Sequence, residues 1–259
     1  MAEITMAERA MPALAPESQA AIDFAISNQI TFCAGNAKLH RLATSMEYVE
    51  RVGIPGRVVE VGVAMGGSAI VLAHAKSPSR PLDLYDVFTL LPPPTAEDGD
   101  KAAQVYEYFL KSAPSNMRDR KYQAHASDLE MFVRANLAQS GIEIDRRSVS
   151  LVKGDVKDTL APTGPVALFH IDCDWVEPMR ICLARTADLI SPAGLIVFDD
   201  YSSFSGCRSL IDAWLASRPE FVVVNNSWSL VAQRSPSDPA LKAMLRRFDP
   251  VVHAARGGS

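Results

Sequence analysis

The sequence predicts an α/β fold, doubly wound, with a mostly parallel seven-stranded sheet in which the last strand is antiparallel. Two observations carry this prediction. Short runs rich in β-branched residues alternate with segments of helical periodicity, which is typical of a parallel sheet covered by helices on both faces. The last two runs are separated only by Ser227, which is too short for a parallel crossover and therefore requires an antiparallel hairpin.

The elements can be justified in chain order. Two segments with helical spacing of apolar residues come first, at 17–33 and 36–53, and Gly53 ends the second. The β-rich runs that follow are expected to be strands at 57–62, 82–88, 148–154, 166–172, 194–200, 221–226 and 228–234. The helices between them are expected near 67–76, 127–139, 177–190 and 206–217.

A chain of 259 residues is expected to form one large domain with appendages. We predict an N-terminal helical segment over 1–53 that can act as a lid, an α/β domain over 54–235, and a C-terminal helix and tail over 236–259. The stretch 88–126 is long for a connection between two strands. Long excursions in compact domains usually form lids or binding loops, or are disordered. Because this one leaves the edge of the sheet at which the motifs below are expected, we predict a lid, with disorder as the alternative.

Composition narrows the class of protein. Apolar residues make up 48% and charged residues 22%, as in ordinary globular proteins, and the net charge of -4 disfavours nucleic acid as a partner.

The four cysteines have no metal-binding spacing, which indicates reduced thiols: Cys33, Cys173, Cys182 and Cys207. No signal-peptide pattern and no apolar stretch of about 20 residues is found, so we expect a cytoplasmic protein with no membrane partner.

The stretch "VVEVGVAMGGS", residues 58–68, runs from a strand through a glycine turn into a helix. Gly62 permits a tight turn, and Gly66 and Gly67 are expected to open the helix with their backbone exposed to a ligand. The spacing G-x-x-x-G-G differs from the dinucleotide fingerprint G-x-G-x-x-G. A simple turn without a ligand is the alternative interpretation.

The acidic residues near this turn favour S-adenosylmethionine over NAD. Asp86 ends the next strand, where a carboxylate can accept both hydroxyl hydrogens of a ribose. Glu60 lies where it would repel a phosphate but attract the amine of an amino acid joined to adenosine. Asp155, after the third strand, can accept from an adenine amino group, or it can cap the helix that begins at "VKDTL".

Two neighbouring strands also end in carboxylates. "HIDCDW" places Asp172 after the fourth strand, and "LIVFDDY" places Asp199 and Asp200 after the fifth. In a doubly wound sheet these ends meet at the edge that carries the glycine turn, where carboxylates repel each other unless a cation joins them. Oxygen ligands suit Mg²⁺ best. Helix capping and solvated loop ends are the alternative.

These motifs resemble a known family. "VVEVGVAMGGSAI", "LYDVFTLLPPP", "LVKGDVKDTL", "FHIDCDWVEP" and "LIVFDDYSSFSGCRSLIDAW" are similar, in order, to the macrocin O-methyltransferase (TylF-type) family. The resemblance covers about residues 35 to 234, and its most specific part is "IDxD … SPxGxIxFDDY … GCR". It implies a Rossmann-like enzyme that uses S-adenosylmethionine and Mg²⁺ to methylate sugar hydroxyls of antibiotics and related natural products.

The resemblance also implies roles for individual residues. Asp172, Asp199 and Asp200 would hold the metal, and Asp172 would also be the general base. The implied cofactor contacts are Glu60, Gly62, Ser68, Asp86, Ser127, Gly154 and Asp155. Related N-terminal helices commonly pack between subunits, so a homo-oligomer is expected.

Three other functions compete with this interpretation. Catechol-type methyltransferases share the layout but carry Asp-Asn where this chain has Asp199 and Asp200, which favours a sugar over a phenolic or catechol acceptor. An NAD-dependent oxidoreductase would need the missing glycine fingerprint. A non-catalytic nucleotide-binding protein would keep the fold but would have no need for the acidic strand ends.

Overall fold

The computed structural model describes residues 13–32, 36–111, 117–239 and 242. Their strands form one sheet in the order β3-β2-β1-β4-β5-β7-β6. The strands are β1 (Arg57–Val61), β2 (Leu82–Asp86), β3 (Val149–Lys153), β4 (Val166–Ile171), β5 (Ile190–Phe198), β6 (Phe221–Asn225) and β7 (Leu230–Arg234). Strands β1 to β5 pair in parallel, and β7 is antiparallel to both β5 and β6. The predicted fold class and the terminal hairpin are confirmed, although the hairpin turn spans 226–229 rather than Ser227 alone.

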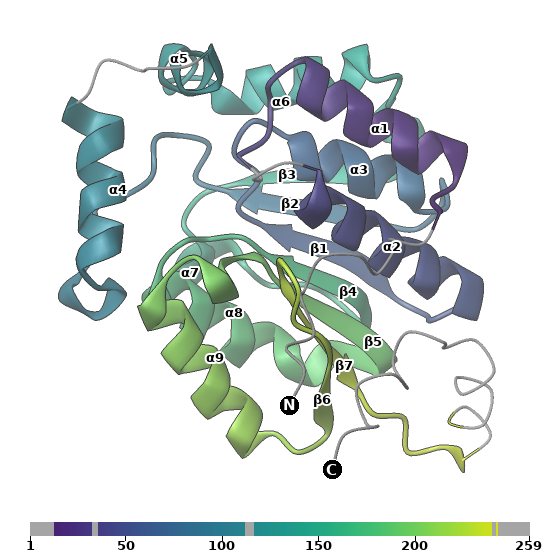
Figure 1. Ribbon diagram of the computed structural model, residues 1–259. Helices are drawn as coiled ribbons and strands as arrows, with labels where there is room; N and C mark the ends of the chain where they lie inside the picture. Colours follow the sequence, from purple (N-terminus) through teal and green to yellow (C-terminus); the bar gives the residue numbers. More distant parts are fainter. Residues whose placement is uncertain (1–12, 33–35, 112–116, 240–241, 243–259) are drawn as a thin grey trace, which may run out of the picture.

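Helices cover both faces of the sheet, as Figure 1 shows. One face carries α1 (Pro16–Ser27), α2 (Ala37–Val52), α3 (Gly67–Ala75) and α6 (Leu129–Gln139). The other carries α7 (Val156–Thr159), α8 (Val176–Thr186) and α9 (Ser205–Ser217). Short 3-10 turns lie at η2 (Asp145–Arg147), η3 (Ala187–Leu189) and η4 (Asp199–Ser202).

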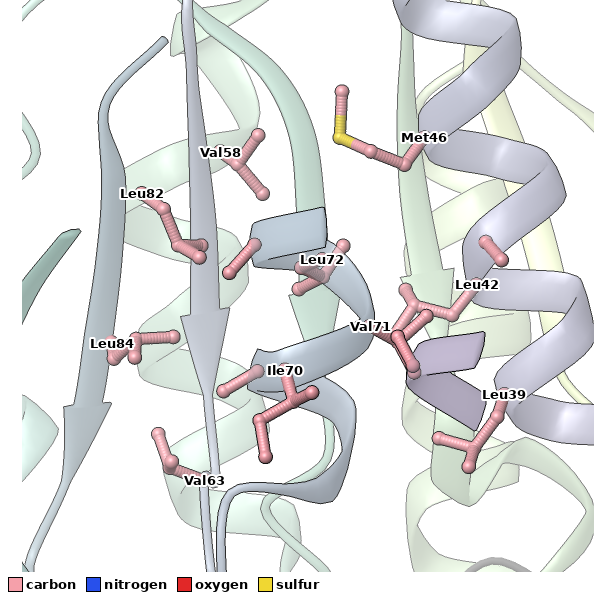
Figure 2. Close-up of a cluster of buried hydrophobic side chains, with 14 of the residues drawn as sticks. Leu39, Leu42, Met46, Val58, Val63, Ile70, Val71, Leu72, Leu82 and Leu84 are labelled. Atoms are coloured by element: carbon pink, nitrogen blue, oxygen red, sulfur yellow. The ribbon is translucent and has the colours of Figure 1, made fainter. Parts of the chain in front are cut away.

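The N-terminal helices belong to the core of this sheet. Leu39, Leu42 and Met46 of α2 are buried against α3, which in turn packs on the side chains of β1 and β2 (Figure 2). Residues 69–73 of α3 are fully buried because α1 and α2 cover the helix on the side away from the sheet. Burial on this scale fixes α2 firmly relative to the strand ends, at about 1.5–3 kcal/mol for each large side chain.

The excursion between β2 and β3 contains helices that the sequence pattern does not predict. They are η1 (Ala96–Asp98), α4 (Asp100–Lys111) and α5 (Met117–Ala124). Figure 1 shows α4 to one side of the sheet, on the side where the chain leaves β2. The helix expected within 236–259 lies outside the described residues apart from 236–239 and 242.

The predicted start of β5 was wrong by four residues. Pro192 and Gly194 indicate a turn in the sequence, but the strand begins at Ile190, which pairs with Val166 of β4 across a register shift. The irregular start of the strand accommodates the proline, and Ala193 takes a left-handed conformation (φ 68°).

No helix among the described residues has the length and hydropathy needed to cross a membrane.

Gly62 brings the carboxyl ends of β1 and β4 into direct contact. Its φ of +88° suits glycine, and a Cβ at this position would lie 1.7 Å from the carbonyl oxygen of Asp172. The amide of Asp172 donates to the carbonyl of Val61 at 2.9 Å in the same place. The position of Asp172 therefore depends on the absence of a side chain at residue 62.

We expect Gly62→Ala to lower the free energy of unfolding by more than about 4 kcal/mol, the range of severe packing defects. Gly141→Ala is the matched control, because Gly141 has a similar φ of +89° but open space around its Cβ position. The control variant should lose only about 1–3 kcal/mol of stability, because its alanine adds backbone strain but no steric clash. Urea denaturation compares them, and equal losses in both variants would contradict the proposed contact.

Candidate active site

A cavity of about 620 Å³ opens at the carboxyl edge of the sheet. Its wall combines the ends of β1 to β5 with parts of the 88–126 excursion and of the N-terminal segment. The predicted site residues that line it are Gly62, Asp86, Gly154, Asp155, Asp172, Asp199 and Asp200. Glu60, Ser68 and Ser127 do not line it; Glu60 and Ser68 are buried, and Ser127 is exposed in the turn between α5 and α6.

Asp86 organises the glycine turn. One of its carboxylate oxygens accepts from the amides of Val63 and Ala64 at 2.7 and 2.9 Å, and the other accepts from the amide of Phe88 at 2.6 Å. Burial raises the pKa of Asp86, although these amides act in the opposite direction. The carboxylate borders the cavity, but the contact with a ribose stays a prediction.

The glycine pair at the start of α3 does not expose its backbone, so this expectation was wrong. Gly66 and Gly67 are both buried. A Cβ on Gly67 would lie 2.7 Å from the carbonyl oxygen of Ile30, because the chain after α1 packs against the start of α3. Gly67 allows the close approach of the N-terminal segment, whereas Gly66 lies against the side chain of Val133 in α6.

Asp155 caps α7, as one of its two interpretations predicted. Its carboxylate accepts from the amide of Lys157 at 2.9 Å and pairs with the ammonium of the same lysine at 3.1 Å. Asp155 also borders the cavity, so a contact with adenine remains a prediction. The amide of Gly154 donates to the carbonyl of Asp86 at 2.9 Å, which ties the ends of β2 and β3 together.

Glu60 and His170 form a buried pair beneath the acidic strand ends. They face each other across β1 and β4, with 2.8 Å between Glu60 Oε1 and His170 Nδ1. Burial alone would lower the pKa of His170, but the hydrogen bond to Glu60 and the nearby carboxylates raise it. Glu60 Oε2 is buried and has no hydrogen-bond partner in the part of the chain that the structure describes.

Carboxylates from β4 and β5 converge at the cavity. Oxygen atoms of Asp172, Asp174 and Asp200 all lie within 4.8 Å of one another, and Asp199 lies within the same distance of Asp172 and His170. Burial, followed by repulsion among the carboxylates, raises the pKa of Asp172 and Asp174 well above the usual range. The pKa of Asp200 rises to about 7 for the same reasons. The carboxylate oxygens of this cluster suit a hard divalent cation such as Mg²⁺, and the metal site stays a prediction.

The backbone holds these carboxylates in place. Asp174 has a φ of +62°, which is uncommon for a residue other than glycine, and its amide donates to the carboxylate of Asp200 at 2.7 Å. Asp174 was not among the predicted metal ligands. Its place in "IDCD", two positions after Asp172, was the available signal.

Lys38 of α2 was missed altogether. Its ammonium donates to the carboxylate of Asp199 at 2.6 Å and to the carbonyl oxygen of the same residue at 3.0 Å. Burial alone would lower the pKa of Lys38, but the negative charges of Asp199 and Asp172 raise it. No local motif marks this lysine, because its partner is 161 residues away in the sequence.

The 88–126 excursion forms one wall of the cavity. Trp175 donates from its ring to the carbonyl of Pro92 at 2.9 Å, and the Asp98 carboxylate accepts from the amide of Val176 at 2.6 Å. Phe32, Phe109 and Tyr122 form an edge-to-face aromatic cluster with centroids 5.1–5.8 Å apart, and all three line the cavity. The excursion thus has the position of a lid; its closure stays a prediction.

The sheet order, with a cavity at the carboxyl edge of the strands, is a Rossmann-like fold that solved O-methyltransferases share. A family model described as macrocin O-methyltransferase (TylF) matches residues 25–219. The chain belongs to this family, so the resemblance seen in its motifs is confirmed.

Two curated relatives are similar over two thirds of this chain. The 8-demethyl-8-(2,3-dimethoxy-alpha-L-rhamnosyl)-tetracenomycin-C 4'-O-methyltransferase of Streptomyces olivaceus is 32% identical over 190 residues, which are 68% of this chain and 64% of the relative. Mycinamicin III 3''-O-methyltransferase of Micromonospora griseorubida is 26% identical over 187 residues, 68% of this chain and 67% of the relative. The chain thus spans about two thirds of the length of these relatives.

Solved structures share the fold. The O-methyltransferase NovP superposes with a TM-score of 0.56 at 22% identity, over 75% of this chain and 78% of the other. CalS11, a calicheamicin methyltransferase, gives 0.52 at 18% identity, over 87% and 95%.

We expect Asp98→Ala to release the excursion from α8, because Asp98 also accepts from the amide and hydroxyl of Thr95 and is buried. The loss should be about 1–3 kcal/mol in stability, with faster proteolysis between residues 88 and 101. Asp100→Ala is the control, since Asp100 is exposed two positions away. Thermal melting and limited proteolysis test this; unchanged cleavage in Asp98→Ala would show that the anchor is unimportant.

Proposed function

We propose that this protein is an S-adenosylmethionine-dependent, divalent-metal-dependent O-methyltransferase that methylates a sugar hydroxyl of a glycosylated natural product. The observation that carries the proposal is the placement of Asp172, Asp174 and Asp200 in the same cavity as the Gly62 turn and Asp86. The names of the family and of its rhamnosyl-tetracenomycin and mycinamicin relatives support a glycosylated acceptor.

The residues present fit both groups that this activity requires. Gly62, Asp86, Gly154 and Asp155 line the cavity and would hold S-adenosylmethionine. The contacts expected from Glu60, Ser68 and Ser127 stay predictions, because these residues do not line the cavity. When bound, S-adenosylmethionine supplies an electrophilic methyl group. The predicted ligands Asp172, Asp199 and Asp200 would hold Mg²⁺. Asp172 and Asp200 lie in one group of close carboxylates with Asp174, and Asp199 lies in a second group with Asp172 and His170. When bound, the metal supplies positive charge that makes an acceptor hydroxyl more acidic.

In this proposal Asp172 removes the proton from the acceptor hydroxyl. Asp172 lines the cavity beside the Gly62 turn, where its carboxylate can accept the proton that the acceptor hydroxyl loses. The contact at Gly62 fixes its backbone next to the glycine turn, so that donor and acceptor can meet at attack distance. Charge disappears when an alkoxide and a sulfonium combine, and the aromatic wall of Phe32, Phe109 and Tyr122 helps to exclude water from that step.

We expect Asp172→Asn to lower kcat by at least about 100-fold, as for loss of a general base, while the affinity for S-adenosylmethionine changes little. Single-turnover methyl transfer and isothermal titration measure the two quantities. Asp174→Asn is the comparison, because Asp174 borders the same cavity. A collapse of kcat in Asp174→Asn alone would transfer the role of base to Asp174. Equal loss of turnover and cofactor binding in Asp172→Asn would contradict its role.

A phenolic or catechol acceptor is the second candidate, and the aromatic cluster at the cavity wall is the observation that favours it. Assays with a rhamnosylated aglycone and with a simple catechol separate the two. Methylation of the catechol at the higher kcat/KM would favour this second candidate.

A further inference from the structure

Lys38 brings a positive charge to the acidic cluster from a different part of the chain. It lies in the first turn of α2, and its ammonium makes two hydrogen bonds to Asp199, at 2.6 Å to the carboxylate and at 3.0 Å to the backbone carbonyl. The side chain is 15% exposed and that of Asp199 is 8% exposed. The ammonium is also within electrostatic range of Asp172 and Asp200.

The helix that carries Lys38 holds it near the cluster. The adjacent Leu39 and the nearby Leu42 are buried in the core between α2 and α3. The second carboxylate oxygen of Asp199 accepts from the hydroxyl of Ser229 at 3.3 Å. Both carboxylate oxygens of Asp199 therefore have partners within the protein.

The ion pair and a divalent cation would act on the same negative charge. Without a counter-charge, the carboxylates of Asp172, Asp174, Asp199 and Asp200 would repel each other at a site largely shielded from water. Lys38 offsets part of this repulsion. A divalent cation held by the same carboxylates would be repelled by the ammonium, because like charges a few ångströms apart oppose each other strongly where water is scarce.

We infer that Lys38 sets the divalent-cation affinity of this cluster, as a tethered counter-cation that stabilises the metal-free site and weakens metal binding. The inference rests on the proposed function, because it takes the acidic cluster as the metal site. Linkage makes the effect reciprocal: if the ammonium lowers the affinity for the metal, the metal weakens the Lys38–Asp199 pair by the same free energy. Lys38 would thus stabilise the site when no metal is bound, and it would keep metal binding reversible by lowering the affinity.

The test compares wild type with Lys38→Met, Lys38→Gln and Lys38→Arg after EDTA treatment. Mg²⁺ is titrated by calorimetry, and Tm is measured without and with saturating Mg²⁺. Lys38→Met removes the charge, Lys38→Gln keeps a hydrogen-bond donor without the charge, and Lys38→Arg keeps the charge. Lys153→Met is the control for net charge, because Lys153 is exposed on β3, three strands from β4.

Both neutral variants should bind Mg²⁺ about tenfold more tightly than wild type, within the usual range of coupling between two sites. Their metal-free Tm should fall below that of wild type, and the rise in Tm caused by Mg²⁺ should be larger. Lys38→Arg and Lys153→Met should stay near wild type. A neutral variant that folds only with Mg²⁺ would also support the inference.

Two results would overturn it, and they are distinguishable. If wild type binds Mg²⁺ but both neutral variants bind it equally or more weakly, Lys38 does not oppose the metal and this inference alone fails. If wild type binds no Mg²⁺, the metal site of the proposed function fails together with the inference.

Discussion

Repulsion among carboxylates at one edge of the sheet is the constraint on which the rest of the site depends. Asp172 and Asp174 follow β4, Asp199 and Asp200 follow β5, and parallel strands bring all of them to the same cavity. Burial and mutual repulsion favour their protonated forms, as the raised pKa values of Asp172, Asp174 and Asp200 indicate. Positive charge that offsets this repulsion comes from Lys38, which pairs with Asp199, and in the proposed function also from a divalent metal.

The backbone around the cluster turns this electrostatic demand into a fixed geometry. The contact of Gly62 with the carbonyl of Asp172 joins the glycine turn to the acidic edge. Asp86 holds the same turn through the backbone amides of Val63 and Ala64, so the glycine turn and the acidic cluster are parts of one structure. The N-terminal helices complete it, because the core between α2 and α3 places Lys38 at Asp199.

Much of this arrangement could be predicted from the sequence, for physical reasons. The alternation of strand-like and helix-like segments predicts the parallel sheet, and the short connection at Ser227 predicts the terminal hairpin. Parallel pairing then places Asp86, Asp172 and Asp200 at one edge of the sheet. Helices α4 and α5 were missed because the proline-rich start of the excursion, "LPPPTAEDGD", suggests a loop. The start of β5 was misplaced because Pro192 and Gly194 indicate a turn where the strand tolerates an irregularity. The pairs Glu60–His170 and Lys38–Asp199 join residues 110 and 161 positions apart, and no local pattern encodes such contacts.

The central claim is that a methyl-donor cradle and a divalent-cation site share one cavity. The most direct measurement is calorimetric titration of S-adenosylmethionine and of Mg²⁺ into EDTA-treated wild type and Asp200→Asn. Asp200 is nearly fully buried within the cluster, so its loss should act on the metal. We predict that S-adenosylmethionine binds to both proteins and Mg²⁺ to wild type alone. Equal Mg²⁺ binding by both proteins, or no binding of S-adenosylmethionine by wild type, would contradict the account.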